Sequence, residues 1–194
     1  MAFNAYLVFK TGGKVEIKGE SKSVPDSKAK QGIAIEVSDY GFGVTMPVTT
    51  SRSDGGGATV GRANFDAFTA SKNIDTATPY LFQYCCTGMN IDSIALHLYR
   101  QGDETDSGAV KYALIIFQFC VVTKVTISGS GEELPKESIE FNYGKCEYVY
   151  HETDKNTGKD TNKEHRYGWS TITNKQDSLM KDWTSFEPPP ATKA

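Results

Sequence analysis

A glycine-rich stretch at Gly56–Ala63 comes close to the pattern of a phosphate-binding loop. Such a loop needs a lysine for the phosphates and a hydroxyl group for the magnesium ion. Arg62 stands at the lysine position here, and Ala63 stands where the hydroxyl is required. A strand pattern follows, so no helix N-terminus would face a phosphate. The stretch is therefore interpreted as a flexible glycine loop and not as a nucleotide site.

Three histidines could take part in acid–base chemistry, namely His97, His151 and His165. His97 alternates with Leu96 and Leu98, which predicts a place at the surface or in a subunit interface. His151 and His165 lie in or beside a polar segment. Neither a serine nucleophile elbow nor a suitably spaced pair of carboxylates accompanies these histidines. The pattern therefore predicts no catalytic residues.

The four cysteines also lack the spacing that chemistry would require. Cys85 and Cys86 are adjacent, whereas a zinc site needs intervening residues between its cysteine ligands. Cys85 shares the apolar stripe of a predicted helix, and Cys120 and Cys146 fall in strand patterns. Buried structural thiols are unreactive. We therefore expect no metal, no cofactor and no enzymatic activity.

Composition limits the partners of this 194-residue chain. The 21 basic and 24 acidic residues give a net charge of -3, which provides no general attraction for nucleic acid. No apolar run approaches the ~18 residues that a membrane span needs, so no membrane insertion is expected. Residues 1–9 lack the basic start of a signal peptide. The protein is expected to begin in the cytoplasm and, if exported, to leave without a signal peptide.

The apolar pattern predicts a mainly β protein with a curved sheet. Phe3–Phe9 alternates with a period of two, as a strand does. The parity of the apolar residues switches at Ser38–Asp39, within Ile33–Val44, and again at Gly144–Lys145. A one-residue switch is what a β-bulge produces, and bulges bend strands around corners. We expect a closed antiparallel β-barrel of two sheets.

One short helix and one long buried strand complete the predicted domain. Thr78–Pro79 resembles a helix start, with Thr78 as the cap, and Gly88 resembles its end. The strand Val110–Ser128 is apolar on both faces between Tyr112 and Val122, so something must cover each face. One face suits the barrel interior. The other is expected to meet the helix or a neighbouring subunit.

Three segments are predicted to be irregular or extended, namely Thr45–Gly61, the polar and charged residues 153–166, and the end of the chain. Thr45–Gly61 is too long for a hairpin turn, and loops of that length are usually functional or disordered. After Asn174 the chain ends in a tail that contains Pro188–Pro190, which favours an extended conformation. The predicted division is a β-barrel domain over 1–174 and an extended tail over 175–194.

Several short motifs, in this order and spacing, resemble the Hcp family, the tube protein of bacterial type VI secretion. The resemblance covers the chain from Phe3 to about Asn174. The matching pieces are Lys18–Ser21, Ile35–Val37, Tyr40–Gly43, Asn73–Leu81, Glu137–Tyr148 and Gly168–Trp169. Each piece is weakly specific alone, whereas their combined order is specific.

This resemblance implies hexameric rings that stack into a tube inside a contractile sheath. The tube would be topped by a spike protein of the VgrG type, ejected from the cell, and able to carry or chaperone effectors in its lumen. It implies an inter-ring loop made of Thr45, Met46, Pro47, Val48, Ser51, Arg52, Ser53, Asp54, Gly55, Gly56 and Gly57. Gly41 is the candidate for the lumen surface, because Tyr40 and Phe42 point the other way. Candidates for the subunit interface are His97, Tyr99 and Trp169.

Two other functions remain open at this stage. A β-barrel could bind a small ligand inside, although the interior residues are large enough to fill it. A hydrolase could use Cys85 or His151 as its reactive group. A ring seen by electron microscopy would separate the tube protein from both alternatives.

Overall fold

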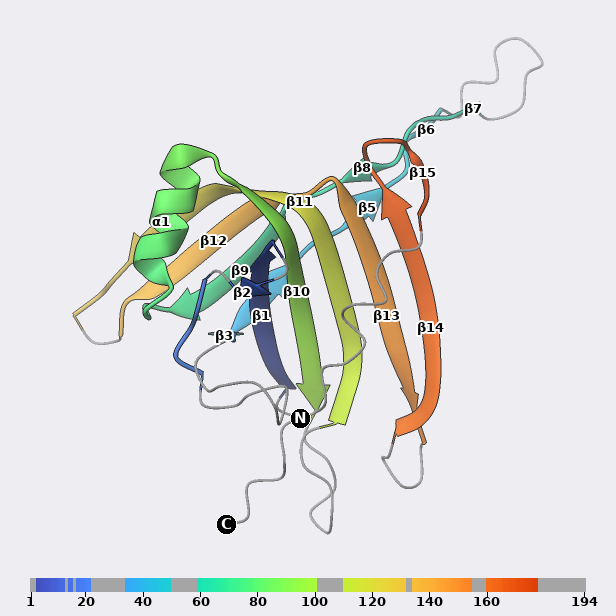
Figure 1. Ribbon diagram of the computed structural model, residues 1–194. Helices are drawn as coiled ribbons and strands as arrows, with labels where there is room; N and C mark the ends of the chain where they lie inside the picture. The colour runs from blue at the N-terminus through green and yellow to red at the C-terminus, as the bar shows by residue number, and fades with distance from the viewer. Residues whose placement is uncertain are drawn as a thin grey trace.

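The computed structural model describes residues 3–12, 14–15, 17–21, 34–49, 59–100, 110–131, 134–154 and 160–177. Figure 1 shows long antiparallel strands side by side in a curved wall, with one helix packed at one end. The elements are β1 (Phe3–Thr11), β2 (Lys14–Val15), β3 (Ile35–Val37), β4 (Asp39–Gly41), β5 (Val44–Thr45), β6 (Val48–Thr49), β7 (Thr59–Val60), β8 (Asn64–Phe65), β9 (Phe68–Asn73), α1 (Thr78–Thr87), β10 (Asn90–Arg100), β11 (Val110–Ser128), β12 (Lys136–Asn142), β13 (Lys145–Thr153), β14 (Asp160–Ser170) and β15 (Lys175–Gln176). The described part is therefore mainly β with one short helix, as expected.

The main sheet is antiparallel and branches at β11. Its hydrogen-bonded path runs β15-β14-β13-β11-β10-β1-β2. The first part of β11 also pairs with β13, whereas the last part pairs with β12, which continues to β9 and β4. Among the described residues this path does not return to its first strand, so the closed barrel is not confirmed.

Both predicted breaks in strand parity are present. β3 pairs with β1 and β4 pairs with β9, and Ser38 alone separates the two strands along the chain. The backbone N–H of Ser38 donates to the carbonyl of Ser71 at 2.8 Å. β12 and β13 are likewise interrupted at Tyr143 and Gly144, although both pair with β11. The wall bends at these points because the strand changes its partner or its face.

The apolar side chains form two buried clusters. The larger one contains Leu7, Phe68, Phe117 and Phe141, together with Leu81 of the helix. Phe68 packs on Phe117 and Phe141, with ring centroids 5.1 and 4.6 Å apart. These rings fill the space between the strands, which disfavours the alternative of a ligand inside the barrel.

The second cluster lies on the opposite face of β1, β10 and β11. It includes Tyr6, Val8, Tyr99, Leu114 and Ile116, all of them buried in the single chain. Both faces of β11 are therefore covered. The helix that was one of the two expected covers for this second face packs instead on the larger cluster, through Leu81. The second face is buried within the chain itself, so it does not by itself require a neighbouring subunit.

A buried ion pair holds α1 against the sheet. Lys72 on β9 lies 2.9 Å from the Glu137 carboxylate on β12, and neither side chain is exposed. The Thr78 hydroxyl donates to the same carboxylate at 2.5 Å. Thr78 is thus inside the helix and does not cap it, because Ala77 occupies the cap position. Pro79 and the left-handed Gly88 stand at the helix ends as predicted.

The described helix is ten residues long. No helix in the part of the chain that the structure describes is long and apolar enough to cross a membrane.

The tail predicted over 175–194 begins with β15, which pairs with β14, and residues 178–194 lie outside the described residues.

Candidate assembly site

The segment Thr45–Gly61 forms a paired arm where the structure describes it. β5 pairs with β8, and farther out β6 pairs with β7. The Gly61 N–H donates to the Pro47 carbonyl at 3.0 Å between these two pairs. Figure 1 shows this arm leaving the body of the protein. The expectation of an irregular loop is therefore wrong for the described ends of the segment.

The middle of the predicted inter-ring loop lies outside the described residues. It comprises Ser51, Arg52, Ser53, Asp54, Gly55, Gly56 and Gly57. Thr45, Met46, Pro47 and Val48 belong to the described base of the arm. Apolar residues recur there at every second position, because alternate side chains of an extended segment share a face. Val44, Met46 and Val48 are 58%, 49% and 51% exposed, so this face is not covered by the chain.

The sheet presents aromatic side chains toward the base of the arm. Tyr148 on β13 stands opposite Tyr167 on β14, and Cys146 stands opposite Trp169. The rings of Tyr167 and Trp169 are stacked, with centroids 6.4 Å apart and planes inclined by 20°. Antiparallel pairing places all four side chains on one face of the sheet.

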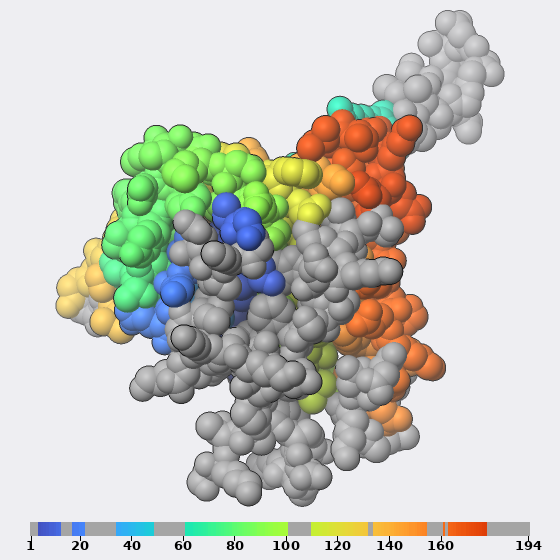
Figure 2. Space-filling model, viewed as in Figure 1, coloured from blue at the N-terminus to red at the C-terminus, as the bar shows by residue number. Residues whose placement is uncertain are grey.

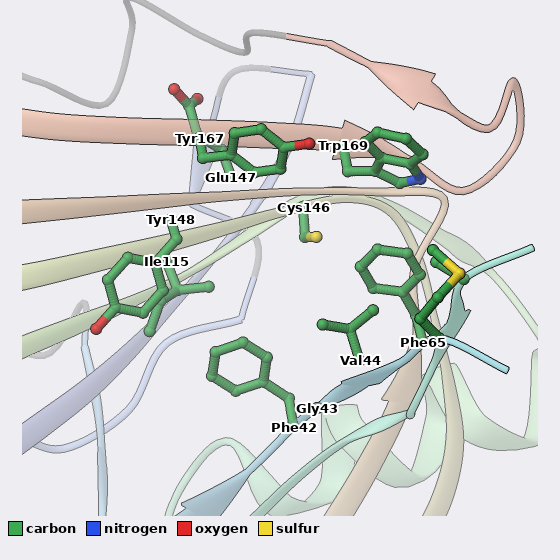
Figure 3. Close-up of a pocket in the computed structure, with 12 residues that line it drawn as sticks. Phe42, Gly43, Val44, Phe65, Ile115, Cys146, Glu147, Tyr148, Tyr167 and Trp169 are labelled. Carbon is green, nitrogen blue, oxygen red and sulfur yellow. The ribbon is translucent and has the colours of Figure 1, made fainter. Parts of the chain in front are cut away.

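Together these surfaces enclose a groove, which we call the arm-base groove. Its volume is about 480 Å³. Its lining comprises Phe42, Gly43, Val44, Met46, Ala63, Phe65, Ile115, Cys146, Glu147, Tyr148, Tyr167 and Trp169. Figure 3 shows Phe42, Val44 and Phe65 facing Tyr148, Tyr167 and Trp169 across it. Large aromatic and aliphatic side chains beside a projecting strand pair suit a protein contact.

The groove carries no evident reactive group. Burial raises the pKa of the Cys146 thiol to about 11, so the thiol is protonated at neutral pH. Burial also raises the pKa of the Cys120 thiol well above its usual range. Glu147 is the one acidic lining residue, and Figure 3 shows its carboxylate pointing away from the cavity. Among the described residues, no three His, Cys, Asp or Glu side chains are grouped to hold a metal ion.

The predicted interface residues are dispersed. Trp169 lines the arm-base groove, whereas His97 and Tyr99 lie on the second face of β10 and are 0% exposed. The expectation that His97 lies at the surface is therefore wrong for the single chain. Burial, followed by the positive charges of Lys111 and Lys10, lowers the pKa of His97 to about 3.

Gly41 occupies the outward face that its neighbours predicted. Tyr40 packs against the larger cluster, and the Phe42 ring lies 5.8 Å from that of Phe117. Gly41 pairs with Thr69, and a Cβ atom at Gly41 would lie 3.1 Å from the exposed Thr69 hydroxyl. Alternation therefore turns position 41 away from the core.

The tyrosines of the groove were not singled out in the sequence analysis. Tyr148 follows the change of parity at Gly144–Lys145, and its side chain is 42% exposed. Tyr167 directly follows residues 153–166, whose polarity predicted an irregular segment. That expectation is wrong from Asp160 on, where β14 begins. The available signal was the alternation of Tyr167 with Trp169, which places two aromatic rings on one face of a strand.

Comparison with known proteins identifies relatives for most of the chain. A family model described as "Type VI secretion system effector, Hcp" matches residues 6–150. Protein hcp1 of Pseudomonas aeruginosa is 27% identical over 116 residues, which cover 59% of this chain and 69% of that protein.

Solved structures share the fold. A protein described as a type six secretion system protein superposes with a TM-score of 0.75 and 26% identity, covering 91% of this chain and 100% of the other. The superposition with Hcp1 from Salmonella typhimurium also covers 91% of this chain and 100% of the other, with a TM-score of 0.66. Its identity of 22% supports the fold alone.

Proposed function

Because this chain belongs to the Hcp family of type VI secretion systems, we propose that six copies form a ring and that the rings stack into the inner tube. The observation that carries this proposal is the family match over residues 6–150, which includes the arm. A tube protein acts through contacts between copies and needs no catalytic group. The arm and the arm-base groove are surfaces of that kind.

The arm-base groove is proposed as a contact with a neighbouring copy in the ring. Cyclic rings use two different surfaces of each protomer, and an aromatic groove can receive the apolar edge of the next copy. Trp169 lines this groove and is the best supported of the three interface candidates. His97 and Tyr99 are buried in the chain, so they would contribute only through the side chains packed on them.

The lumen surface is proposed to include Gly41. The pairing of β3 with β1 and of β4 with β9, with Ser38 between them, supports a wall that wraps toward closure as a barrel. Gly41 lies on the outer side of that wall, next to Thr69. In a ring, this side would face the central channel. Effectors are proposed to travel there.

The remaining partners follow from the family. The tube is proposed to meet a spike protein of the VgrG type at its tip and a contractile sheath around it. The protein would assemble in the cytoplasm and then reach the extracellular space when the sheath contracts, without a signal peptide. The domain over 1–174 would build the ring, and the role of the tail is left to experiment.

The arm is proposed to join one ring to the next, and its replacement tests the proposed function. A Gly-Ser turn in place of residues 47–60 keeps the β5–β8 pair and removes the outer arm. We expect hexamers of normal mass but no release of the protein into the medium. Cells that lack the sheath are the control, because they should retain even the wild-type protein. A shortened protein that is still released would contradict the role of the arm, and one that fails to fold would place the arm in the core.

A further inference from the structure

Phe119 on β11 has a backbone conformation that is unusual for a large side chain. Its φ is 54°, in the left-handed region. Among the described residues, the only other non-glycine residue there is Asn174, a residue type that tolerates this conformation. Holding a bulky residue in this region costs stability, and such strain concentrates at functional positions. The Phe119 side chain nevertheless remains 50% exposed, so core burial does not explain the cost.

Two neighbours extend Phe119 into a small apolar surface, the end cluster of Phe119, Gly144 and Ile172. A Cβ atom on Gly144 would lie 2.7 Å from Ile172 Cδ1 and 3.2 Å from Phe119 Cβ. A side chain at position 144 would therefore displace its neighbours. Ile172 is 63% exposed. Lys145 Nζ lies 5.9 Å from the centre of the Phe119 ring, and an ion pair with Asp177 balances its charge.

Hydrogen bonds hold the end cluster in place. The Gly144 N–H donates to the Gln118 carbonyl at 2.9 Å, next to Phe119. The Thr171 N–H and hydroxyl both donate to the Gly144 carbonyl, at 3.0 and 2.8 Å. The backbone that carries Phe119, Gly144 and Ile172 is thus held in place before any partner arrives. Preorganised side chains lose little entropy on binding.

The end cluster lies at the same end of the sheet as the arm. Gln118 pairs with Lys145, Lys145 with Ser170, and Ser170 with Lys175, so these residues form one row at that end. The Arg62 guanidinium, at the base of the arm, donates to the Thr171 carbonyl next to Ile172. Figure 2 shows the orange-red end of β14 and β15 directly beside the base of the arm. A partner reached by the arm therefore approaches the end cluster as well.

We propose that the end cluster is an axial contact, through which one ring docks on a second copy of this chain in the next ring. This inference rests on the proposed function. Cyclic symmetry orients every protomer of a ring the same way, so all copies of Phe119 lie at one height. Their place beside the base of the arm would put them on the ring face from which the arm projects. Two stacked rings would share six such contacts. If the contacts act independently and each is weakened about twofold, the association constant between the two rings falls roughly sixtyfold.

The test separates stacking from folding and from ring formation. Phe119→Gly removes the aromatic side chain, and glycine suits the left-handed backbone. The Tm of this variant should therefore stay within about 3 °C of the wild type. Phe119→Asn serves as a second variant with the same backbone preference, and Phe119→Tyr keeps an aromatic ring. Leu134→Gly is the matched control, since Leu134 is exposed and lies before β12, away from the cluster. Hexamers are concentrated under crowding until the wild type forms tubes, which are sedimented and seen by electron microscopy.

We expect Phe119→Gly and Phe119→Asn to form normal hexamers and to lose at least about tenfold in sedimented tubes. Phe119→Tyr and Leu134→Gly should match the wild type. Equal tube yields from Phe119→Gly and the wild type would overturn the inference. So would hexamers that fall apart in Phe119→Gly, because the residue would then belong to the contacts within a ring. Wild-type rings that never stack would contradict both the inference and the proposed stacking, whereas a monomeric wild type would contradict the proposed ring itself.

Discussion

At the scale of single residues, His97 shows how burial changes the protonation of a side chain. It lies on the second face of β10 and is 0% exposed. Its neighbours across the sheet are Tyr6 on β1 and Leu114 on β11. Removing the imidazole from water disfavours its charged form, and two nearby lysines add repulsion, so the pKa falls to about 3. His97 is therefore neutral in the folded protein at neutral pH. Within the single chain it is a buried residue, whereas the alternating pattern predicted a place at the surface or in a subunit interface.

This burial predicts that acid will destabilise the protein. The unfolded chain binds a proton at His97 below pH 6.5, whereas the folded chain does so only below about pH 3. The contribution of neutral His97 to the free energy of unfolding is at its full value above pH 6.5 and decreases as the pH falls toward 3. Between pH 7 and pH 5 we expect a loss of about 2 kcal/mol in the free energy of unfolding. Denaturant titrations at fixed protein concentration measure it.

His97→Phe should remove this part of the pH dependence, because phenylalanine does not titrate. His165→Gln is the control, since the side chain of His165 is 69% exposed. The His165 variant should retain the wild-type difference between pH 7 and pH 5. An unchanged difference in His97→Phe would show that other groups cause the acid sensitivity.

At the scale of elements, the position of α1 depends on the buried ion pair of Lys72 and Glu137, neither of which is exposed. Lys72 Nζ lies 2.9 Å from Glu137 and 2.7 Å from Asp75, and the Thr78 hydroxyl completes the network. A ten-residue helix is not stable alone, so its position relies on packing and on this network. Removing one partner of a buried pair costs more than removing both, since the remaining buried charge is poorly compensated. Without the Glu137 charge, Lys72 keeps the carboxylate of Asp75, which is partly exposed.

Glu137→Gln should therefore destabilise the protein by about 3 kcal/mol in denaturant titration. The double variant Lys72→Met with Glu137→Met removes both buried charges and should lose less than the single variant. A double variant less stable than Glu137→Gln would show that the pair contributes net stability. Lys136→Met, at an exposed position beside the pair, controls for the loss of a lysine.

The elements also show how far the sequence could lead. The helix, the main strands and the breaks at Ser38 and Gly144 were predictable, because one face of each strand was apolar and a change of parity was visible. The left-handed backbone at Phe119 was not, since β11 is apolar on both faces there and no change of parity marks the position. The buried Lys72 was not predictable from its residue type, because lysine side chains normally face solvent. Its shared parity with Phe68 and Ala70 was the available signal.

The candidate site was predictable to a lesser extent. The motifs around Tyr40–Gly43 and Gly168–Trp169 carried the family resemblance, and Trp169 does line the arm-base groove. The groove itself was not predictable. Its two walls, Val44–Met46 and Cys146–Trp169, are far apart in sequence, and pairing across β13 and β14 brings the aromatic rings together. Only the folded chain places the arm above them.

At the scale of the whole molecule, Gly41 tests where the channel lies. Gly41→Glu would add one negative charge per copy to the proposed lumen, and screening over roughly 8–10 Å in a wet channel should let the ring survive. We expect normal hexamers but weaker co-purification of an acidic effector, because like charges repel. Gly41→Gln matches the size without the charge and should bind as the wild type does. Equal recovery from all three would remove Gly41 from the cargo surface, and monomers would place it in a packed interface.

The central claim is that this chain assembles as a ring, and the native mass tests it most directly. Light scattering on the purified protein at tens of micromolar should report about six times the 21.3 kDa of one chain. Dilution should leave that mass unchanged if the contacts between copies are extensive. A monodisperse species of 21.3 kDa under the same conditions would contradict the account.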